Sequence, residues 1–269
     1  MKRLAVLGHP VAHSRSPQIH ARFGQDCGVA LDYQALDVAP EALADRLQAL
    51  HAEGWHGLNL TLPHKSAALS LCVSLSDRAQ RAGAVNTLVR AGDGWHGDNT
   101  DGEGCLRDLR DNLGVTVRGR RVLVLGAGGA ARGILEPLLA EQPASLAISN
   151  RNPWKPEALA QAFAALGTVL PRTHLALKGD SFDLILNATS AGHTGEMSRL
   201  PGQLLAPGGV CYDLSYGTAF APFAAWARAQ GAAAVHDGLG MLVEQAAAAF
   251  ALWFGQRPDT RAVLAALRG

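Results

Sequence analysis

The pattern of hydrophobic and polar residues is clearest between residues 121 and 139. Four successive apolar residues, Val122 to Leu125, are typical of a short parallel strand that is buried on both faces. A glycine-rich turn follows, and the next apolar positions repeat at the spacing of one helix face: Ile134, Leu135, Leu138 and Leu139. The sequence therefore predicts a strand, a tight turn and a helix in direct succession.

Strands and helices continue to alternate after this turn. The pattern predicts further strands at residues 145–149, 183–186 and 210–214 and near Val235, with helices at about 156–166 and 222–230. Short apolar strands that alternate with helices are typical of a doubly wound parallel sheet. We therefore expect an α/β domain of Rossmann type over residues 102–237.

The first hundred residues alternate in the same way and predict a smaller α/β domain. Its strands are expected at residues 4–7, 33–38, 57–62 and 84–90. The tetrapeptide that follows the last of these strands, Ala91-Gly92-Asp93-Gly94, has the composition of a hairpin turn. We expect this domain to cover residues 1–101.

Three helix starts are visible in the same region. Ser16 and Pro17 are expected to serve as the N-cap and the first helical residue of one helix. A second helix follows Pro40 and carries a buried face of Leu43, Leu47 and Leu50. A third is expected to begin at residues 63–65, which places Lys65 at a helix N-terminus. The helix dipole disfavours a cation there, so Lys65 is either a solvated surface lysine or a functional residue.

The last predicted helix begins after Gly238 and contains a glutamine among apolar neighbours. Gln245 shares one face of this helix with Met241, Ala248, Ala249 and Leu252. A side-chain amide that points inward needs a hydrogen-bond partner. The pattern leaves open whether that partner belongs to the protein or to a ligand.

Composition and charge narrow the class of protein. The 269 residues are 48% hydrophobic and 17% charged, which is typical of a globular enzyme and not of a disordered chain. The formal net charge is +1, without the basic excess that nucleic-acid binding requires. We therefore expect a small-molecule substrate as the binding partner and no nucleic acid.

The distribution of cysteine, histidine and apolar runs bears on metals and on location. The four cysteines form no C-x-x-C pair and the ten histidines are scattered, so we expect neither disulfides nor a metal site. The apolar run at residues 4–7 is too short for a signal peptide. Glu244 and Gln245 interrupt the longest apolar run, which is too short to span a membrane. We therefore expect a cytoplasmic protein without membrane contact.

The glycine-rich turn indicates a dinucleotide site. Gly126, Gly128 and Ala131 form a G-x-G-x-x-A pattern between the predicted strand and helix, where backbone N–H groups and the helix dipole favour a pyrophosphate. About 20 residues after the first glycine, NAD-binding domains usually carry an acidic residue that binds the ribose. Here Arg151 lies at that place and Lys155 follows it, which favours the 2′-phosphate of NADP.

Seven motifs together resemble the shikimate dehydrogenase family, over nearly the whole chain. They are Ser14-x-Ser16-Pro17, Asn59-x-Thr61-x-Pro63-His64-Lys65, Ala82-Gly83-Ala84-Val85-Asn86-Thr87, Gly97-Asp98-Asn99-Thr100-Asp101-Gly102, Gly126-Ala127-Gly128-Gly129-Ala130-Ala131-Arg132, Asn187-Ala188-Thr189-Ser190 and Asp237-Gly238-Leu239-Gly240-Met241-Leu242. The resemblance implies reversible interconversion of 3-dehydroshikimate and shikimate with NADP(H), in aromatic amino-acid biosynthesis by way of chorismate. It also implies that the C-terminal helices, residues 238–269, return to the first domain.

The resemblance assigns roles to matching positions. Lys65 and Asp101 correspond to the catalytic pair, and the residues alone leave open which of them carries the proton. Substrate contacts are implied for Ser14, Ser16, Thr61, Lys65, Asn86, Asp101, Tyr216 and Gln245. Cofactor contacts are implied for Gly126, Ala127, Gly128, Gly129, Ala130, Asn150, Arg151, Lys155, Leu214 and Gly238.

Two departures from the family pattern concern the cofactor. Asn152 stands where the family usually has threonine, and Lys155 stands where it usually has a second arginine. Lysine offers a point charge in place of a two-pronged guanidinium, so we expect a weaker preference for NADP over NAD.

The alternative functions are a quinate or dual shikimate/quinate dehydrogenase and a catalytically silent NADP-binding relative. The expected assembly is a monomer or a homodimer.

Overall fold

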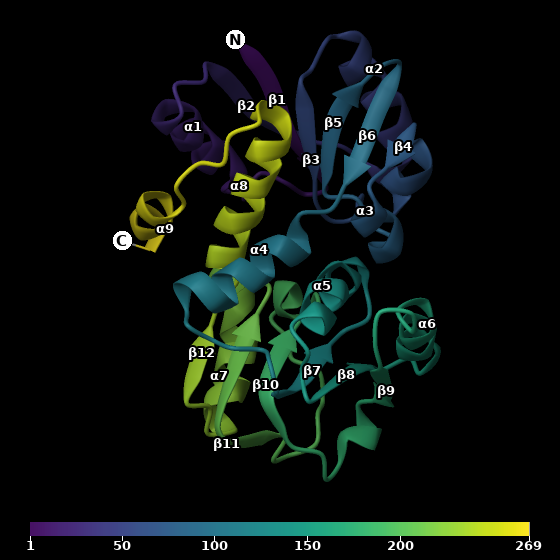
Figure 1. Cartoon of the computed structure of the whole chain (residues 1–269), viewed down its shortest axis with the longest axis vertical. Coiled ribbons are helices and arrows are strands. Elements are labelled where there is room, and N and C mark those ends of the chain that lie inside the picture. Colours follow the sequence, from purple (N-terminus) through teal and green to yellow (C-terminus); the bar gives the residue numbers. More distant parts are fainter. Residues whose placement is uncertain (269) are drawn as a thin grey trace. The chain divides into compact units, whose positions relative to one another are not determined.

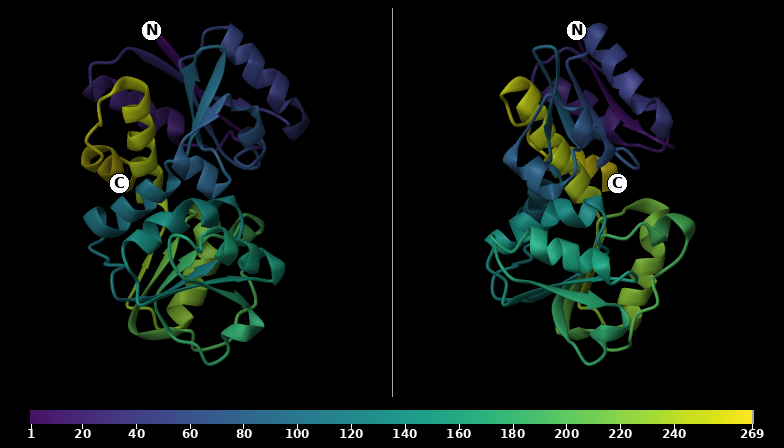
Figure 2. Two further views of the ribbon diagram at one scale, coloured as in Figure 1. Left: turned by 45° about the vertical axis from the view of Figure 1, so that its right-hand side comes forward. Right: turned by 90° about the vertical axis from the view of Figure 1, so that its right-hand side faces the viewer.

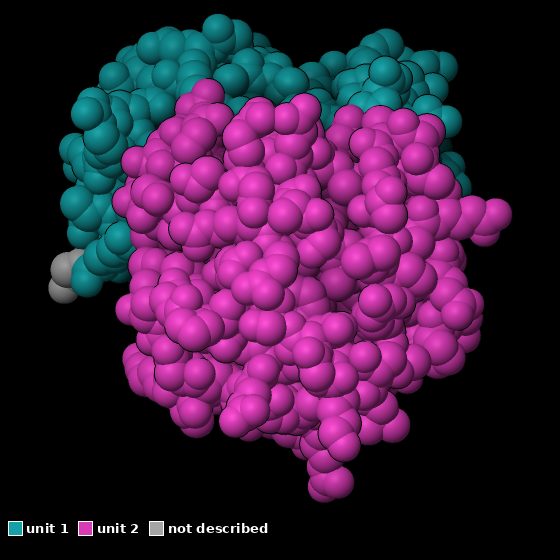
Figure 3. Space-filling model, turned by 60° about the horizontal axis from the view of Figure 1, so that its bottom comes forward, with its two compact units in different colours: residues 1–104, 242–269 teal, residues 105–241 magenta. Residues whose placement is uncertain are grey.

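The computed structural model describes residues 1–268 and separates into two compact units. Unit 1 comprises Met1–Gly104 together with the chain from Leu242 onward, and unit 2 comprises Cys105–Met241. Figure 3 colours the two units separately. Each unit contains one six-stranded sheet, and each is described below by itself.

The sheet of unit 1 is mixed. Its strands lie in the order β2-β1-β3-β5-β6-β4. Strand β1 is parallel to both β2 and β3, whereas β5 is antiparallel to β3 and forms a hairpin with β6. The strand bounds are β1 Lys2–Gly8, β2 Leu31–Asp37, β3 Gly57–Leu60, β4 Ser74–Leu75, β5 Thr87–Ala91 and β6 Gly94–Asp98.

Helices cover both faces of this sheet (Figure 1). Leu43, Leu47 and Leu50 of α2 are at most 2% exposed and pack against β1 and β3 on one face, as their spacing predicts. Ala249 and Trp253 of α8 pack against β1 and Tyr33 on the other, so the C-terminal helix does return to the first unit. The helix bounds are α1 Ser16–Asp26, α2 Leu43–Ala52, α3 Asp77–Ala82, α4 Asp101–Arg107, α8 Leu239–Phe254 and α9 Arg261–Arg268, with short 3₁₀ turns at Pro40–Ala42 and Ala67–Leu71.

Two of the predicted helix starts in unit 1 are wrong. Ser16 is the first residue of α1 and its N-cap is Arg15, without a side-chain cap; the Ser14 hydroxyl instead accepts the Ser16 N–H at 3.3 Å. Lys65 does not begin an α-helix but lies in a turn that precedes a 3₁₀ helix. A cation in such a turn is not opposed by a long helix dipole, so the conflict that singled out Lys65 does not exist.

Unit 2 has the predicted doubly wound sheet. All its strands are parallel, in the order β12-β11-β10-β7-β8-β9. The strand bounds are β7 Arg121–Leu125, β8 Ser145–Asn150, β9 Val169–Thr173, β10 Phe182–Asn187, β11 Leu205–Asp213 and β12 Ala234–His236. The helix bounds are α5 Gly129–Ala140, α6 Trp154–Ala162 and α7 Ala221–Ala229, with a π-helical turn at Asp108–Asn112 and 3₁₀ turns at Leu175–Leu177, Ala191–Thr194 and Gly217–Phe220.

Helices cover the sheet of unit 2 (Figure 2), and alternate side chains of the central strand β7 pack against different helices. Val122 and Val124 pack against α5 and α6, whereas Leu123 and Leu125 pack against α7. The chain moves outward from β7 through β8 to β9 on one side and through β10 to β12 on the other. The strand order therefore reverses between β7 and β10, where doubly wound folds bind their ligands at the carboxyl ends of the strands.

Candidate active site

A close pair of opposite charges lies in unit 1. The Lys65 Nζ is 2.5 Å from Oδ2 of Asp101, and the two side chains are 19% and 5% exposed. Lys65 belongs to the turn after β3, and Asp101 is the first residue of α4. The structure therefore brings together the two residues that the sequence predicts as the catalytic pair, although they are separated by 36 positions.

The sheet register explains why these segments meet. Because β5 is antiparallel to both neighbours, Thr87 is paired with Asn59 of β3 on one side and with Asp98 of β6 on the other. The end of β3, the start of β5 and the end of β6 thus share one edge of the sheet. Asn86 is held there by its backbone, since its carbonyl accepts from Leu60 N–H at 2.8 Å and its N–H donates to the carbonyl of Asp98 at 3.0 Å.

The side chain of Asn86 connects Asp101 to the C-terminal helix. Its Nδ2 lies 2.8 Å from Oδ1 of Asp101, 3.0 Å from the hydroxyl of Thr100 and 3.2 Å from Oε1 of Gln245. Gln245 is 9% exposed, and its Nε2 donates to the carbonyl of Leu242 at 2.9 Å. The inward amide of Gln245 therefore has protein partners at both ends.

Neighbouring groups fix the loop that carries Asp101. The side chain of Asn99 accepts from the backbone N–H of Asp101 at 3.0 Å and donates to the carbonyl of Ala84 at 2.9 Å. Asp98 pairs with Arg78 at 2.6 Å and with the hydroxyl of Ser76 at 2.5 Å. Burial tends to raise the pKa of Asp98, but these two donors outweigh it and hold the pKa below the ordinary value. Asp98 and Asn99 thus serve as structural supports, which is consistent with their composition as turn residues.

Ser14, Ser16 and Thr61 flank the ends of β1 and β3. These strands are parallel, so the loop after β1 and the turn after β3 leave the sheet at the same edge. The backbone N–H of Thr61 donates to the carbonyl of Leu7 at 2.9 Å. Ser16 is 5% exposed, whereas Ser14 and Thr61 are half-buried. The eighth predicted substrate residue, Tyr216, belongs to unit 2 and follows β11.

The glycine-rich turn of unit 2 has the backbone that a dinucleotide requires. Gly126 has φ +101°, and a Cβ there would lie 2.8 Å from the carbonyl oxygen of Ala188. Around Gly128, by contrast, a Cβ would meet no atom within 4 Å, and α5 begins at the next residue. Ala131 is fully buried against the sheet. There is therefore space beside Gly128, directly before α5, and a phosphate bound at a helix N-terminus needs such space.

Cationic side chains lie at the carboxyl end of β8. Arg151 follows this strand directly, and Lys155 stands in the first turn of α6 with its Nζ 5.5 Å from the ring centroid of Trp154. The Ser149 hydroxyl is 2.8 Å from Nδ1 of His174. Burial and the nearby Arg151 charge lower the pKa of His174. The edge therefore carries positive charge and no carboxylate at positions 149–151.

The remaining predicted cofactor residues, Leu214 and Gly238, lie against each other. A Cβ on Gly238 would be within 3.0 Å of the carbonyl oxygen of Asp213 and closer still to Leu214. The carboxyl group of Asp213 accepts from Asn187 Nδ2 at 3.1 Å and from the Ser215 N–H at 2.9 Å. It is fully buried, and burial raises its pKa to about 6 despite these donors.

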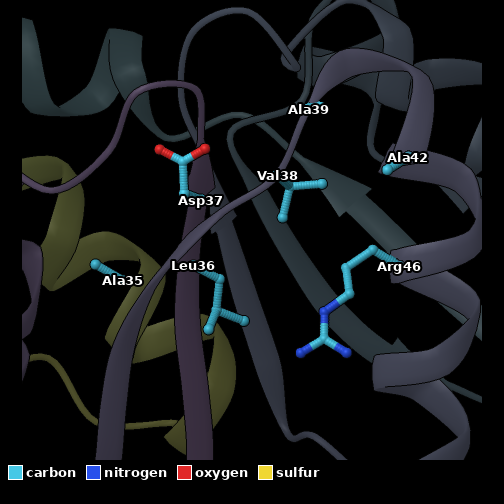
Figure 4. A pocket seen from close by; sticks show the side chains of 7 residues that line it. All are labelled: Ala35, Leu36, Asp37, Val38, Ala39, Ala42 and Arg46. Carbon is cyan, nitrogen blue, oxygen red and sulfur yellow. The ribbon is translucent and has the colours of Figure 1, made fainter.

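Other features do not suggest a second site. Residues 1–268 contain no cluster of three or more His, Cys, Asp or Glu side chains that could bind a metal ion. No helix in the same range has the length and apolar character needed to cross a membrane. A hollow in unit 1 is lined by residues 35–39, Ala42 and Arg46 and includes none of the predicted site residues (Figure 4).

A doubly wound dinucleotide fold, with a lysine–carboxylate pair on a separate unit of the same chain, defines the class of dinucleotide-dependent dehydrogenases. Three family models match the chain. They are the shikimate dehydrogenase substrate binding domain at residues 6–88, shikimate / quinate 5-dehydrogenase at residues 109–196 and the shikimate 5′-dehydrogenase C-terminal domain at residues 238–268. The chain belongs to the shikimate dehydrogenase family.

Individual relatives agree with this placement. The shikimate dehydrogenase (NADP(+)) of Methylococcus capsulatus is 52% identical over 266 residues, which cover 98% of this chain and 95% of the relative. A crystal structure of an Ael1 enzyme from Pseudomonas putida has a TM-score of 0.92 at 42% identity, covering 99% of this chain and 98% of that chain. Thermus thermophilus shikimate 5-dehydrogenase, solved with NADP(H) and shikimate, has a TM-score of 0.86 at 38% identity, covering 100% and 99%.

Proposed function

We propose that this chain catalyses the reversible NADPH-dependent reduction of 3-dehydroshikimate to shikimate, in the pathway to chorismate and the aromatic amino acids. The observation that supports this most directly is the pair of Lys65 Nζ and Asp101 Oδ2 at 2.5 Å, in a chain 52% identical to a shikimate dehydrogenase (NADP(+)). When bound, NADPH would supply a hydride to the ketone carbon, and NADP⁺ would accept it from that carbon in the reverse direction. The protein must supply a proton to the oxygen on the same carbon, or remove it in the reverse direction.

Lys65 and Asp101 are proposed to handle that proton. Lys65 is proposed to provide the N–H donor for a substrate hydroxyl or ketone, and Asp101 keeps its Nζ in place. The carboxylate of Asp101 is held by Nδ2 of Asn86 through its other oxygen. With both carboxylate oxygens occupied, rotation of the Asp101 side chain would break a hydrogen bond, so the pair is preorganised for catalysis.

The substrate carries several hydroxyls and a carboxylate, and the proposed contacts are small polar side chains. Ser14, Ser16, Thr61, Asn86 and Gln245 are proposed to bind it from unit 1 and Tyr216 from unit 2. A site that binds hydroxyls discriminates against analogues without them, because its own polar groups would lose their partners.

NADP fits the residues of unit 2. The residues proposed to hold its phosphates are Gly126, Ala127, Gly128, Gly129 and Ala130. The space beside Gly128 at the start of α5 supports this assignment. Arg151, with Asn150 and Lys155, is proposed to bind the 2′-phosphate, and Leu214 and Gly238 to contact the rest of the cofactor.

A cytoplasmic enzyme is proposed on the basis of its thiols. All four cysteines are free, which suits a reducing compartment. A monomer or a homodimer is the proposed assembly, and its mass in solution, measured by light scattering, distinguishes the two.

The deciding experiment measures NADPH formation by the purified protein from NADP⁺ and shikimate, and in parallel from NADP⁺ and quinate. We expect turnover on shikimate. One of the matching family models describes shikimate / quinate 5-dehydrogenases, so equal or higher kcat/KM on quinate would favour that alternative. A protein that binds NADP but turns over neither acid would be a silent relative, and the proposed activity would be wrong.

A further inference from the structure

A line of buried polar side chains leads away from Asp101 on the side opposite to Lys65. It comprises Tyr33 of β2, Asn59 of β3, Thr87 of β5 and Asn86, and we call these four residues the relay. Their exposed fractions are 8%, 5%, 0% and 1%. None of them is exposed enough for solvent to replace a lost partner, so their polar groups depend on hydrogen bonds within the protein.

The relay is continuous at hydrogen-bond distances. The Tyr33 hydroxyl lies 2.7 Å from Oδ1 of Asn59. Nδ2 of Asn59 lies 3.1 Å from the hydroxyl of Thr87, and that hydroxyl lies 2.8 Å from Oδ1 of Asn86. Nδ2 of Asn86 then reaches Oδ1 of Asp101 at 2.8 Å, and Oδ2 of Asp101 accepts from Lys65.

Donor and acceptor roles along the relay follow from its end. The ionised carboxylate of Asp101 can only accept, so Asn86 must present its amide nitrogen to it and its oxygen to Thr87. The Thr87 hydroxyl must therefore donate to Asn86 and accept from the amide nitrogen of Asn59. The oxygen of Asn59 then faces the phenol of Tyr33, which donates. All hydrogen bonds run in one direction, from Tyr33 to Asp101.

Tyr33, at the far end of the relay, packs against the buried ring of His20. The Tyr33 ring stacks on His20 with centroids 4.3 Å apart and planes at 7°. His20 is fully buried, and burial lowers its pKa to about 3, so it stays neutral. Neither of its ring nitrogens has a hydrogen-bond partner among residues 1–268, although Asn59 lies beside it.

We propose that Tyr33, Asn59 and Thr87 are positioning residues for the catalytic pair: through this one-way relay they hold the Asn86 amide so that it orients Asp101 toward Lys65. This inference rests on the proposed function of Lys65 and Asp101. It differs from a merely structural role, because a structural network would affect the amount of folded protein and leave the chemical step of the folded molecules unchanged.

The kinetic test compares Thr87→Val, which keeps the shape and removes the hydroxyl, with Thr87→Ser, which keeps the hydroxyl. We expect Thr87→Val and Tyr33→Phe each to lower kcat about 10-fold, within the range of coupling between residues of one network, and Thr87→Ser to stay within about 2-fold of wild type. Asn86 also accepts from the Thr100 N–H at 2.8 Å, so a loss on the scale of removing Lys65 is not expected. The control is Tyr212→Phe, which removes another buried tyrosine hydroxyl bonded to a carboxylate, in unit 2.

Two further kinetic readouts separate positioning from loss of folded protein. With 4-deuterated NADPH, a slower chemical step raises the isotope effect on kcat, whereas a smaller folded fraction leaves it unchanged. In a Lys65→Ala background, Thr87→Val should have less than about a 2-fold further effect, because residues that act as a unit are not additive. An unchanged isotope effect, or the same 10-fold loss with and without Lys65, would overturn the proposal.

Hydrogen exchange at the Asn86 side chain tests the relay without any measurement of enzyme activity. The side-chain amide protons of Asn86, identified by their absence in Asn86→Asp, should exchange slowly with solvent in the wild-type protein. We expect exchange at least about 10-fold faster in Thr87→Val and Tyr33→Phe, but not in Thr87→Ser or Tyr212→Phe. Unchanged protection in the first two variants would contradict the relay. A wild-type protein with protected amides and no turnover would instead overturn the proposed function alone.

Discussion

The candidate sites of the two units are built in opposite ways. In unit 1 the chemistry depends on buried side chains that bind one another: Asp101 and Asn86 are 3% and 1% exposed, and Lys65 bonds to Asp101. In unit 2 the proposed phosphate site consists of backbone N–H groups at the start of α5 and of exposed cations, Arg151 and Lys155. Side chains that share hydrogen bonds should lose function together, whereas separate exposed charges should contribute independently.

The largest expected effect tests this contrast in unit 1. Lys65→Ala and Asp101→Ala should each lower kcat by about 10²–10⁴-fold, the usual contribution of a general acid–base group, while the protein stays folded. The double variant should be scarcely worse than the poorer single variant, because neither residue acts without the other. Lys2→Ala, at an exposed lysine of β1, is the control. Steady-state turnover on shikimate within a few-fold of wild type for both single variants would refute the assignment.

The next effect concerns stability in unit 2, where one side chain is as buried as those of unit 1. Burial raises the pKa of Asp213 to about 6, above the unfolded value of 3.8. Between these two values the folded state binds more protons at Asp213 than the unfolded state. The contribution of this carboxyl to stability is therefore greatest below about pH 4 and falls as pH rises to 6. Asp213→Asn lacks this titration. Its free energy of unfolding relative to wild type should rise by about 2–3 kcal/mol between pH 4 and pH 7.

Denaturant unfolding of both proteins at several pH values measures this difference, in which the other titrating groups cancel. The exposed Asp93 provides the control, since Asp93→Asn should give a flat difference. A flat difference for Asp213→Asn as well would mean that the Asp213 carboxyl is ionised without cost in the folded protein.

The parts of the fold and of the candidate site that the sequence predicts are those that depend on interactions between residues close together in the chain. The run at residues 122–125 and the spacing of Leu43, Leu47 and Leu50 record burial directly, and the structure confirms both. Strand β9 was not predicted. It contains Pro171, whose missing N–H donor is tolerated because β9 lies at the sheet edge. The six-residue helix α3 was not predicted either, although its N-cap Ser76 and its left-handed C-cap Gly83 are residues that typically mark helix ends.

The contacts of the candidate site that the sequence does not predict join residues far apart in the chain. The motifs identified Lys65, Asp101 and Asn86, and the helix pattern with the family resemblance identified Gln245. Gln245 is 159 positions from Asn86, however, and no periodicity indicates that they meet. Thr87 and Asn59 were part of the quoted motifs without a role of their own. Their alternation in β3 and β5 predicts that they face the same side of a sheet; only the register shows that they are paired.

The cofactor site should respond as independent charges. Arg151→Ala should weaken NADP binding by about 1.5–3 kcal/mol, roughly 10- to 100-fold, because a charged hydrogen bond to the 2′-phosphate is lost. NAD binding should change little. Lys155→Arg should strengthen the preference for NADP by a few-fold, since a guanidinium can bind the phosphate through two donors. In the double variant the two effects should add, unlike those of Lys65 and Asp101.

Measuring kcat/KM with NADP and with NAD in each variant gives the change in cofactor preference. Arg199→Ala is the control, at an exposed arginine of unit 2. Equal losses for NAD and NADP in Arg151→Ala would mean that Arg151 supports the fold and does not bind the phosphate. Strong non-additivity with Lys155 would break the contrast between the two units.

The smallest expected effects are those of single substrate contacts. Ser14→Ala and Gln245→Ala should weaken shikimate binding by about 1–3 kcal/mol, the cost of leaving a polar partner unpaired, with little change in NADP binding. For Gln245 we expect the lower end of this range, because Asn86 keeps Asp101 and Thr100 as partners when the Gln245 amide is removed.

The Gln245→Ala variant also tests whether the buried amide of Gln245 in α8 binds a ligand or only stabilises the core. Its Oε1 accepts from Asn86 and its Nε2 donates to the carbonyl of Leu242. Both ends of the side-chain amide therefore have hydrogen-bond partners without a ligand. Calorimetric titration with shikimate, together with the unfolding midpoint, separates the two roles. A ligand contact predicts weaker binding at nearly unchanged stability in Gln245→Ala. A core amide predicts the reverse, because the cavity left by the side chain would destabilise α8 and leave the affinity of the folded molecules intact.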